Sequence, residues 1–399
     1  MKKALPVMFA LAVIAAPAAA SPIFLQDSGP AAAKADDPEA AANAAYKAWK
    51  AETDQAKKLE MGTALVSTYF GSKAAEAVGY AGMFDQGATP ESKLAMSLAY
   101  YNASVAAGKD GAYNEYALGN LATLSKDPKK IEEYGEVYLQ KYPTGRYVPY
   151  VQKAVVAAHY GMFDAALKEK RYPEAIQYGS EMLAKSQDGF IYAYRLSSTG
   201  LGDETANGAK SVFLGKISGW ADKGIAYVEA GSMPEGADKD RWAKDKPTTL
   251  ALLYKAKGVD MYYKTAQSNP PSADAYAPAI DALKKSLTFN EKDPITYYFL
   301  SQVYNTQYAD YSKKFEALPA ADQTGDPGKA VLEKVNTAAD DVINSLVHVI
   351  AYAGENKALK DTVQPQLVEY WKYRHPDAPD AWQDEIKKVN GSAPSAPAQ

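Results

Sequence analysis

A repeated tetrapeptide constrains the fold of this chain more than any other feature of its sequence. Gly-Met-Phe-Asp occurs at residues 82–85 and again at residues 161–164. Chance does not readily give such a repeat in a chain with nine Met and ten Phe. Upstream of each copy, apolar residues recur with the spacing of an amphipathic helix. The repeat therefore favours a fold built from duplicated helical units.

The two upstream helices and a third segment share a pattern that is centred on a glycine. In three segments a large apolar residue follows the glycine four positions later: Gly62 and Val66, Gly135 and Leu139, and Gly179 and Leu183. The spacing of the glycines is near two units, and then one unit, of a helical hairpin of about 34 residues with loop insertions. This period predicts stacked helical hairpins.

Helix starts are marked by a capping residue in front of a proline. Four such pairs occur, at Asp37-Pro38, Thr89-Pro90, Asp127-Pro128 and Asp293-Pro294. Proline suits the first position of a helix because its missing N–H has no partner there in any case. Between these starts the chain is rich in Ala, Leu, Lys, Glu and Tyr, and no stretch alternates like a strand for long. The sequence predicts an all-α fold.

The hairpin pattern resembles the tetratricopeptide-repeat (TPR) family. Tyr297, Leu300, Ser301 and Tyr304 follow the spacing of that family's first-helix pattern, W-x2-L-G-x2-Y, with Tyr for Trp and Ser for Gly. Residues 138–147 are similar to a helix-ending pattern of exported bacterial TPR proteins, including outer-membrane-assembly and Tol-Pal-associated ones. The resemblance implies an α-solenoid of antiparallel hairpins over residues 37–389, clearest over residues 111–315.

The N-terminus has the three parts of a secretory signal peptide. Lys2 and Lys3 precede an apolar stretch, which ends in small residues. We expect cleavage after Ala20 and a periplasmic mature chain. The apolar stretch is shorter than the ~18 residues of a membrane-spanning helix, so a membrane anchor is the weaker alternative. No later segment predicts a membrane span.

Both ends of the mature chain show little periodicity. Residues 21–36 are rich in Pro, Gly, Ser and Ala, which predicts a flexible leader. Residues 390–399 predict a disordered tail. The helical repeats are expected between these two segments.

Composition excludes several kinds of chemistry. The chain has no Cys, which removes disulfides, thiolate metal sites and Cys nucleophiles. Its net charge of −4 gives no bulk electrostatic footprint for nucleic acid. His159, His348 and His375 form no pair at zinc-ligand spacing, and no glycine-rich loop matches a nucleotide-binding motif. We therefore expect no metal, no cofactor and no nucleic-acid partner.

Tyrosine is the unusual residue, with 30 copies against ten Phe and five Trp. We expect most of them to pack between helices, because a phenol buries its ring while its hydroxyl reaches water at the rim. The TPR resemblance also implies a concave groove that is lined by particular first-helix positions. In this chain those positions are Tyr116, Asn120, Tyr160, Asp164, Lys168, Lys255, Tyr262, Tyr263, Tyr298, Gln302 and Asn305.

A groove with this lining is aromatic and polar, which suits an extended peptide or a glycan. It lacks the cluster of Lys and Arg that captures acidic chain ends. We therefore predict a periplasmic scaffold or adaptor that binds envelope proteins or their peptide segments without catalysis. A soluble glycan or small-ligand binding protein is the alternative, and a cell-wall hydrolase with paired carboxylates is the third possibility. Truncating Tyr262 and Tyr298 is expected to weaken binding with little loss of melting temperature.

Overall fold

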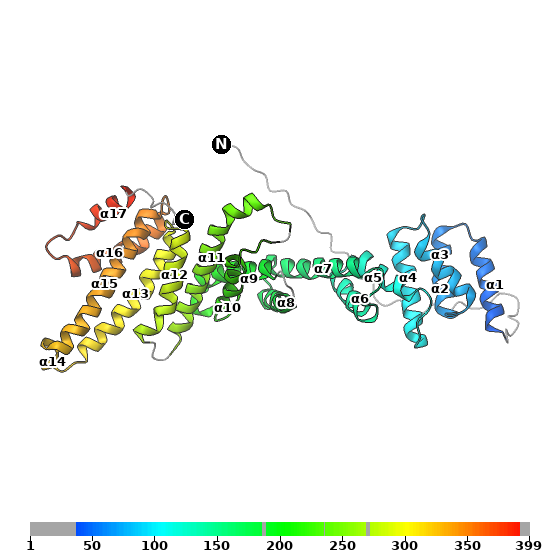
Figure 1. The fold of residues 1–399 in the computed structure, drawn as a ribbon, viewed down its shortest axis with the longest axis horizontal. Coiled ribbons are helices and arrows are strands. Elements are labelled where there is room, and N and C mark those ends of the chain that lie inside the picture. The colour runs from blue at the N-terminus through cyan, green and yellow to red at the C-terminus, as the bar shows by residue number, and fades with distance from the viewer. Residues whose placement is uncertain (1–36, 186–188, 235, 269–271, 392–399) are drawn as a thin grey trace. The chain divides into compact units, whose positions relative to one another are not determined.

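The computed structural model describes residues 37–185, 189–234, 236–268 and 272–391. These residues form 17 α-helices and two short 3-10 helices, with no strand among them (Figure 1). The predicted all-α fold class is confirmed. The expected signal peptide, the leader at residues 21–36 and residues 392–399 of the expected tail lie outside the described residues. Residues 390 and 391 belong to the last helix.

No helix in the described ranges combines the length and the apolar character that crossing a membrane would require.

The described residues divide into two compact units, one within residues 37–125 and 133–151 and one within residues 126–132 and 152–391. The first unit is built from α1 to α5 and most of α6. Their bounds are α1 Pro38–Ala51, α2 Gln55–Thr68, α3 Lys73–Phe84, α4 Pro90–Ala107, α5 Asn114–Leu124 and α6 Pro128–Lys141.

The second unit holds nearly all of α7 and every later helix. The α-helices are α7 Val148–Lys168, α8 Tyr172–Lys185, α9 Phe190–Asn207, α10 Ile217–Glu229, α11 Lys239–Ala266, α12 Ala277–Phe289, α13 Pro294–Glu316, α14 Ala320–Thr324, α15 Asp326–Tyr352, α16 Lys357–Arg374 and α17 Trp382–Gly391. The 3-10 helices are η1 Gly208–Lys210 and η2 Ala273–Tyr276. Helices close in sequence pack together, as α11 does with α12, α12 with α13, and α13 with α15.

All four helix starts predicted from a cap and a proline are confirmed. In each case the cap's side-chain oxygen accepts a hydrogen bond from a backbone N–H in the first turn: Asp37 from Glu39, Thr89 from Ser92, Asp127 from Lys129 and Asp293 from Ile295. The proline follows as the first helical residue of α1, α4, α6 and α13. A local signal therefore places these helices, because the cap satisfies backbone donors that the helix itself leaves unpaired.

The three pattern glycines lie at buried positions, as a repeated hairpin requires. A Cβ on Gly179 would lie 2.7 Å from Leu196, so this glycine lets α8 and α9 approach closely. After Gly135 and Gly179 the more buried residue is the one three positions on, Tyr138 and Met182, whereas after Gly62 both Leu65 and Val66 are buried. Positions three and four residues on share one helix face, and in α6 and α8 the neighbouring helix covers the former more completely.

Tyrosines on one face of α13 pack between helices, as expected. Tyr304 is only 5% exposed. Tyr297 stacks on His348 of α15 with 4.5 Å between ring centroids, and Tyr308 meets Tyr370 of α16 edge-on at 5.0 Å. This face of α13 is therefore structural.

Candidate functional site

Three of the predicted groove tyrosines come together in the second unit. Tyr262 and Tyr263 lie near the end of the long helix α11, and Tyr298 lies in the first turns of α13. Their rings surround the buried Phe299, with centroids 6.5, 6.1 and 5.6 Å from its ring in that order. Tyr262 and Tyr263 are also 4.9 Å apart. We call Tyr262, Tyr263, Tyr298 and the neighbouring Gln302 the tyrosine surface.

Close helix packing brings these side chains together. A Cβ on Gly258 of α11 would lie 2.7 Å from Leu283 of α12, so the glycine allows the two helices to approach. On the other side, the ring of Tyr263 lies over the turn after α9, where a Cβ on Gly208 would be 3.3 Å away. Gly208 has a φ of +56°, which favours glycine there. The ring of Tyr263 thus packs against both Phe299 and the turn at Gly208.

The members of the tyrosine surface are half-buried, and burial keeps the phenols of Tyr262 and Tyr263 protonated. Burial raises the pKa of Tyr263 to about 12. Burial also raises the pKa of Tyr262. Both hydroxyls therefore keep their protons at any physiological pH.

The polar groups of the tyrosine surface differ in how they are satisfied. Tyr262 is paired with Thr306, whose hydroxyl donates to the carbonyl of Gln302 at 3.0 Å. Within the described part of the chain, the hydroxyls of Tyr263 and Tyr298 and the amide of Gln302 form no hydrogen bond. These three groups are therefore free to pair with a partner molecule.

Two other predicted groove residues of these helices are engaged internally. Lys255 of α11 forms an ion pair of 2.7 Å with Asp293, the cap of α13, and both side chains are largely buried. Asn305 accepts a hydrogen bond of 2.5 Å from the hydroxyl of Tyr370. Lys255 and Asn305 thus hold helices together, so they offer a partner less than the unpaired groups do.

Tyr160, Asp164 and Lys168 form a separate polar cluster on α7. They lie one turn apart along one face, where Arg195 of α9 joins them. Arg195 donates to Asp164 at 2.8 Å and to the Tyr160 hydroxyl at 3.4 Å, and Lys168 lies 2.5 Å from Asp164. The hydrogen bond from Lys168, followed by that from Arg195, holds the pKa of Asp164 below its usual range. This cluster ties α7 to α9.

Tyr116 and Asn120 belong to the first unit, on α5. Arg146 donates to the Tyr116 hydroxyl at 2.9 Å, and the Asn120 amide donates to Ser97 at 3.1 Å. The Tyr116 ring also meets Phe84 and Tyr147 edge-on. Both predicted groove residues therefore have partners inside their own unit.

Sequence reasoning missed several residues that define these sites. Arg195 completes the α7 cluster, Phe299 is the centre of the tyrosine surface, and Thr306 satisfies Tyr262. Phe299 directly follows Tyr298, so a helical wheel of α13 could have indicated it. Arg195 and Thr306 had no such local signal.

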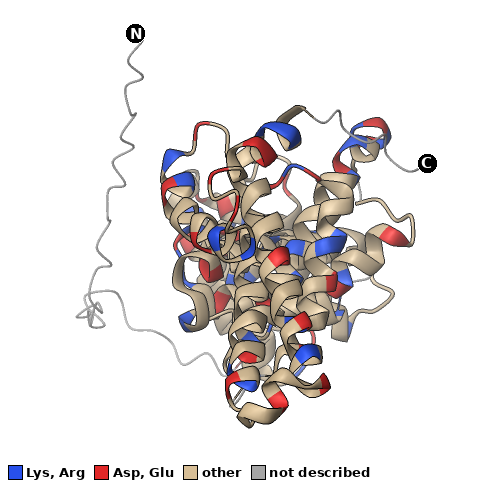
Figure 2. Cartoon of the chain, turned by 90° about the vertical axis from the view of Figure 1, so that its left-hand side faces the viewer, with Lys and Arg blue, Asp and Glu red and all other residues tan. Residues whose placement is uncertain are grey.

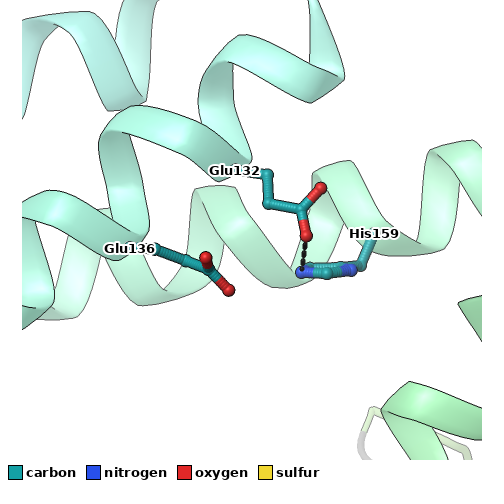
Figure 3. Close-up of side chains that lie close together, drawn as sticks. All are labelled: Glu132, Glu136 and His159. Carbon is teal, nitrogen blue, oxygen red and sulfur yellow. Dashed lines mark ion pairs between the residues drawn. The ribbon is translucent and has the colours of Figure 1, made fainter.

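His159 is buried on α7 and is the histidine best placed for chemistry. Its Nε2 lies 3.3 Å from an oxygen of Glu132 on α6 (Figure 3). The second unit thus supplies two ligand side chains here, fewer than the three or four of protein zinc sites. Glu136, which Figure 3 also shows, lies on the part of α6 that belongs to the first unit. We therefore assign no metal site to His159 and Glu132.

A buried carboxyl pair lies where α9, α10 and α11 meet. Glu204 and Asp260 are both 0% exposed. Asp260 accepts backbone N–H groups of Gly215 at 2.5 Å and Ser218 at 2.8 Å. Burial, with the charge of Asp260 beside it, raises the pKa of Glu204 to about 9. Both carboxyls are closed off from solvent, and the two hydrogen bonds of Asp260 hold the turn before α10 in place.

Charged residues of both signs are interspersed along the helices, as Figure 2 shows. Many of them form ion pairs within a helix or between neighbours, such as Arg374 with Asp340 at 2.7 Å. The tyrosine surface differs from this background in being aromatic and uncharged.

No family model matches the chain. No curated protein and no solved structure matches it either. The resemblance to the TPR family therefore stays a prediction that rests on the motifs quoted above.

Proposed function

We propose that this chain is an exported, non-catalytic scaffold that binds an extended segment of an envelope protein through its tyrosine surface. An α-solenoid of TPR-like hairpins over residues 37–389 is part of this proposal. The packing of helices that are close in sequence supports it, since each repeat of a solenoid contacts its neighbours. The signal-like N-terminus supports export.

The observation that carries the proposal is that the hydroxyls of Tyr263 and Tyr298 and the amide of Gln302 are unpaired, while the two tyrosine rings are held in place. Tyr263 and Tyr298 are held by Phe299, so ordering them on binding costs little conformational entropy. Their hydroxyls and the amide of Gln302 supply donors and acceptors along one helix-helix junction. The backbone of an extended peptide presents matching N–H and C=O groups at every residue.

A protein segment suits this surface better than a glycan does. The rings of Tyr262, Tyr263 and Tyr298 already contact Phe299 or one another, which occupies part of each ring. A sugar that stacks on an aromatic ring needs an open face, whereas a peptide backbone needs the polar edges. The hydroxyl edges are what these tyrosines offer.

The test uses phenylalanine because alanine would confuse binding with folding. Tyr262 contacts Tyr276 and Phe299 and hydrogen-bonds Thr306, so its truncation is expected to lower stability as well. The double variant Tyr263→Phe/Tyr298→Phe keeps both rings and removes only the two hydroxyls. We expect it to bind about 1 to 3 kcal/mol more weakly, at about 0.5 to 1.5 kcal/mol for each hydrogen bond.

The measurement is the affinity of the purified mature chain for an immobilised array of short peptides from envelope proteins, with and without free sugar. Tyr150→Phe is the control, because Tyr150 is 65% exposed and lies in the first unit. The wild type and the control should bind the same peptides despite the sugar, and the double variant should lose them at an unchanged melting temperature. Peptide binding that the double variant retains would refute the proposal, as would loss of binding to sugar.

A further inference from the structure

The first unit contains a cavity of about 470 Å³ at the ends of four helices. It lies among the last turns of α1 and α3 and the first turns of α2 and α4. Its volume falls in the range of about 300 to 1,000 Å³ that is typical of small-molecule sites. Every residue that lines it belongs to the first unit, so it is independent of the tyrosine surface.

One part of the cavity wall is apolar and closely packed. Met96 is 1% exposed, and a Cβ on Gly82 would lie 2.6 Å from its Cγ. Trp49 is stacked on Tyr46 with 5.7 Å between ring centroids. Leu59 and Ala81 complete this wall. A ligand would therefore meet a preformed apolar surface with an indole in it.

The cavity also contains a cation that lacks an acidic partner. The Lys58 ammonium lies 5.1 Å from the centroid of the Trp49 ring, and no carboxylate of the described chain pairs with it. The preceding Lys57, by contrast, forms an ion pair of 3.0 Å with Glu52. Lys58 is half-buried, so its charge is less screened by water than that of an exposed lysine.

One acidic residue limits how much negative charge the site accepts. Asp85 lines the cavity, and one of its oxygens accepts the backbone N–H of Gly87 at 2.9 Å. Its charge disfavours a second anionic group on a ligand beside Lys58. The rim also has the uncharged hydrogen-bonding groups of Gln55, Thr89 and Ser92.

We infer that this cavity binds a small apolar molecule with a single carboxylate. The apolar body would lie on Trp49, Leu59 and Ala81, and the carboxylate would pair with Lys58. A free aromatic or aliphatic acid has this chemistry, and so does the last residue of a peptide with an apolar side chain. The charge complementarity with Lys58 selects both over neutral molecules of the same shape.

The test is isothermal titration calorimetry of the full mature chain with matched acids and amides. The probes are 3-phenylpropanoate, octanoate, the neutral amide of each, and a tripeptide that ends in phenylalanine with a free or an amidated terminus. We expect at least one acid to bind about tenfold more tightly than its amide, because a hydrogen bond to a charged group is lost with the carboxylate. The tighter of the free acid and the free-ended tripeptide identifies the source of the ligand.

Two neighbouring lysines provide a matched pair of variants. Lys58→Gln should remove the preference for acid over amide, while Lys57→Gln should preserve it, since Lys57 pairs with Glu52 outside the cavity lining. Circular dichroism of both variants checks that the fold is intact. The inference is overturned if acids and amides bind alike, if no probe binds at millimolar concentration, or if Lys58→Gln keeps the preference.

Discussion

The two copies of Gly-Met-Phe-Asp have one sequence and two structures. At residues 82–85 the copy ends a helix, since Phe84 closes α3 and Asp85 accepts the N–H of Gly87 in the following turn. At residues 161–164 the copy lies inside α7, and Asp164 pairs with Lys168 one turn later. The residues that follow decide the outcome: Gln-Gly-Ala-Thr-Pro stops the first helix, whereas Ala-Ala-Leu-Lys continues the second.

The surroundings of the two copies differ as much as their backbones. Gly82 packs directly against Met96, while Gly161 has no atom within 4 Å of where a Cβ would be. Phe163 is 0% exposed, while Phe84 is half-buried and meets Tyr116 edge-on. The duplicated sequence therefore predicts a helix in both places. Which of its residues are buried depends on the helices that pack against each copy.

The two glycines give the largest expected contrast. Gly82→Ala should lower the free energy of unfolding by about 1 to 3 kcal/mol, because the new methyl group overpacks Met96. Gly161→Ala should raise it by up to about 1 kcal/mol, because alanine favours a helix interior and nothing blocks its methyl group. Urea unfolding of the full chain, followed by circular dichroism, measures both. If both variants changed the free energy of unfolding in the same direction, the two glycines would not differ in their packing as described.

The two aspartates give a smaller contrast. Asp164→Asn should cost about 0.5 to 1 kcal/mol at pH 7, because the pairs with Lys168 and Arg195 are partly exposed. Asp85→Asn should be nearly neutral in stability, because the amide oxygen can still accept the N–H of Gly87. An equal loss of unfolding free energy in the two variants would contradict the different roles of Asp164 and Asp85.

The contribution of Asp164 to stability should also depend on pH. The pKa of Asp164 is depressed in the folded chain, chiefly by Lys168 and then by Arg195. Its stabilising contribution is therefore present above its unfolded pKa of about 4 and is lost as pH falls through the lower, folded value. The stability difference between the wild type and Asp164→Asn should shrink below about pH 4. A difference that stays constant down to pH 2 would show that charge pairing is not its cause.

Helix positions could be predicted from the sequence because their signals are local. A cap oxygen and a proline act within one turn, so Asp37, Thr89, Asp127 and Asp293 marked their helices correctly. The innermost residue of a helix was harder to predict. Tyr138, and not Leu139, is fully buried on α6, because the position of the neighbouring helix decides between residues on the same face.

The candidate site could be predicted only in outline. The repeat register placed eleven residues on one surface, but it could not say which of them are already paired inside the chain. Lys255 meets Asp293 and Asn305 meets Tyr370, across 38 and 65 residues of sequence. Such pairings depend on how distant helices pack, which no local pattern encodes. The register named Tyr263, Tyr298 and Gln302, but only the structure shows that their polar groups are unpaired.

Photo-cross-linking in intact cells tests the central claim most directly. A photoreactive phenylalanine analogue at position 298 removes one hydroxyl, a loss of about 0.5 to 1.5 kcal/mol that leaves Tyr263 and Gln302 to hold the partner, and it reports what contacts the tyrosine surface. The same analogue at the exposed Tyr150 is the control. We predict a defined protein adduct at position 298, on an envelope protein and at an extended segment, and no matching adduct at position 150. The absence of an adduct at position 298, a glycan adduct there, or the same adducts at both positions would contradict the account.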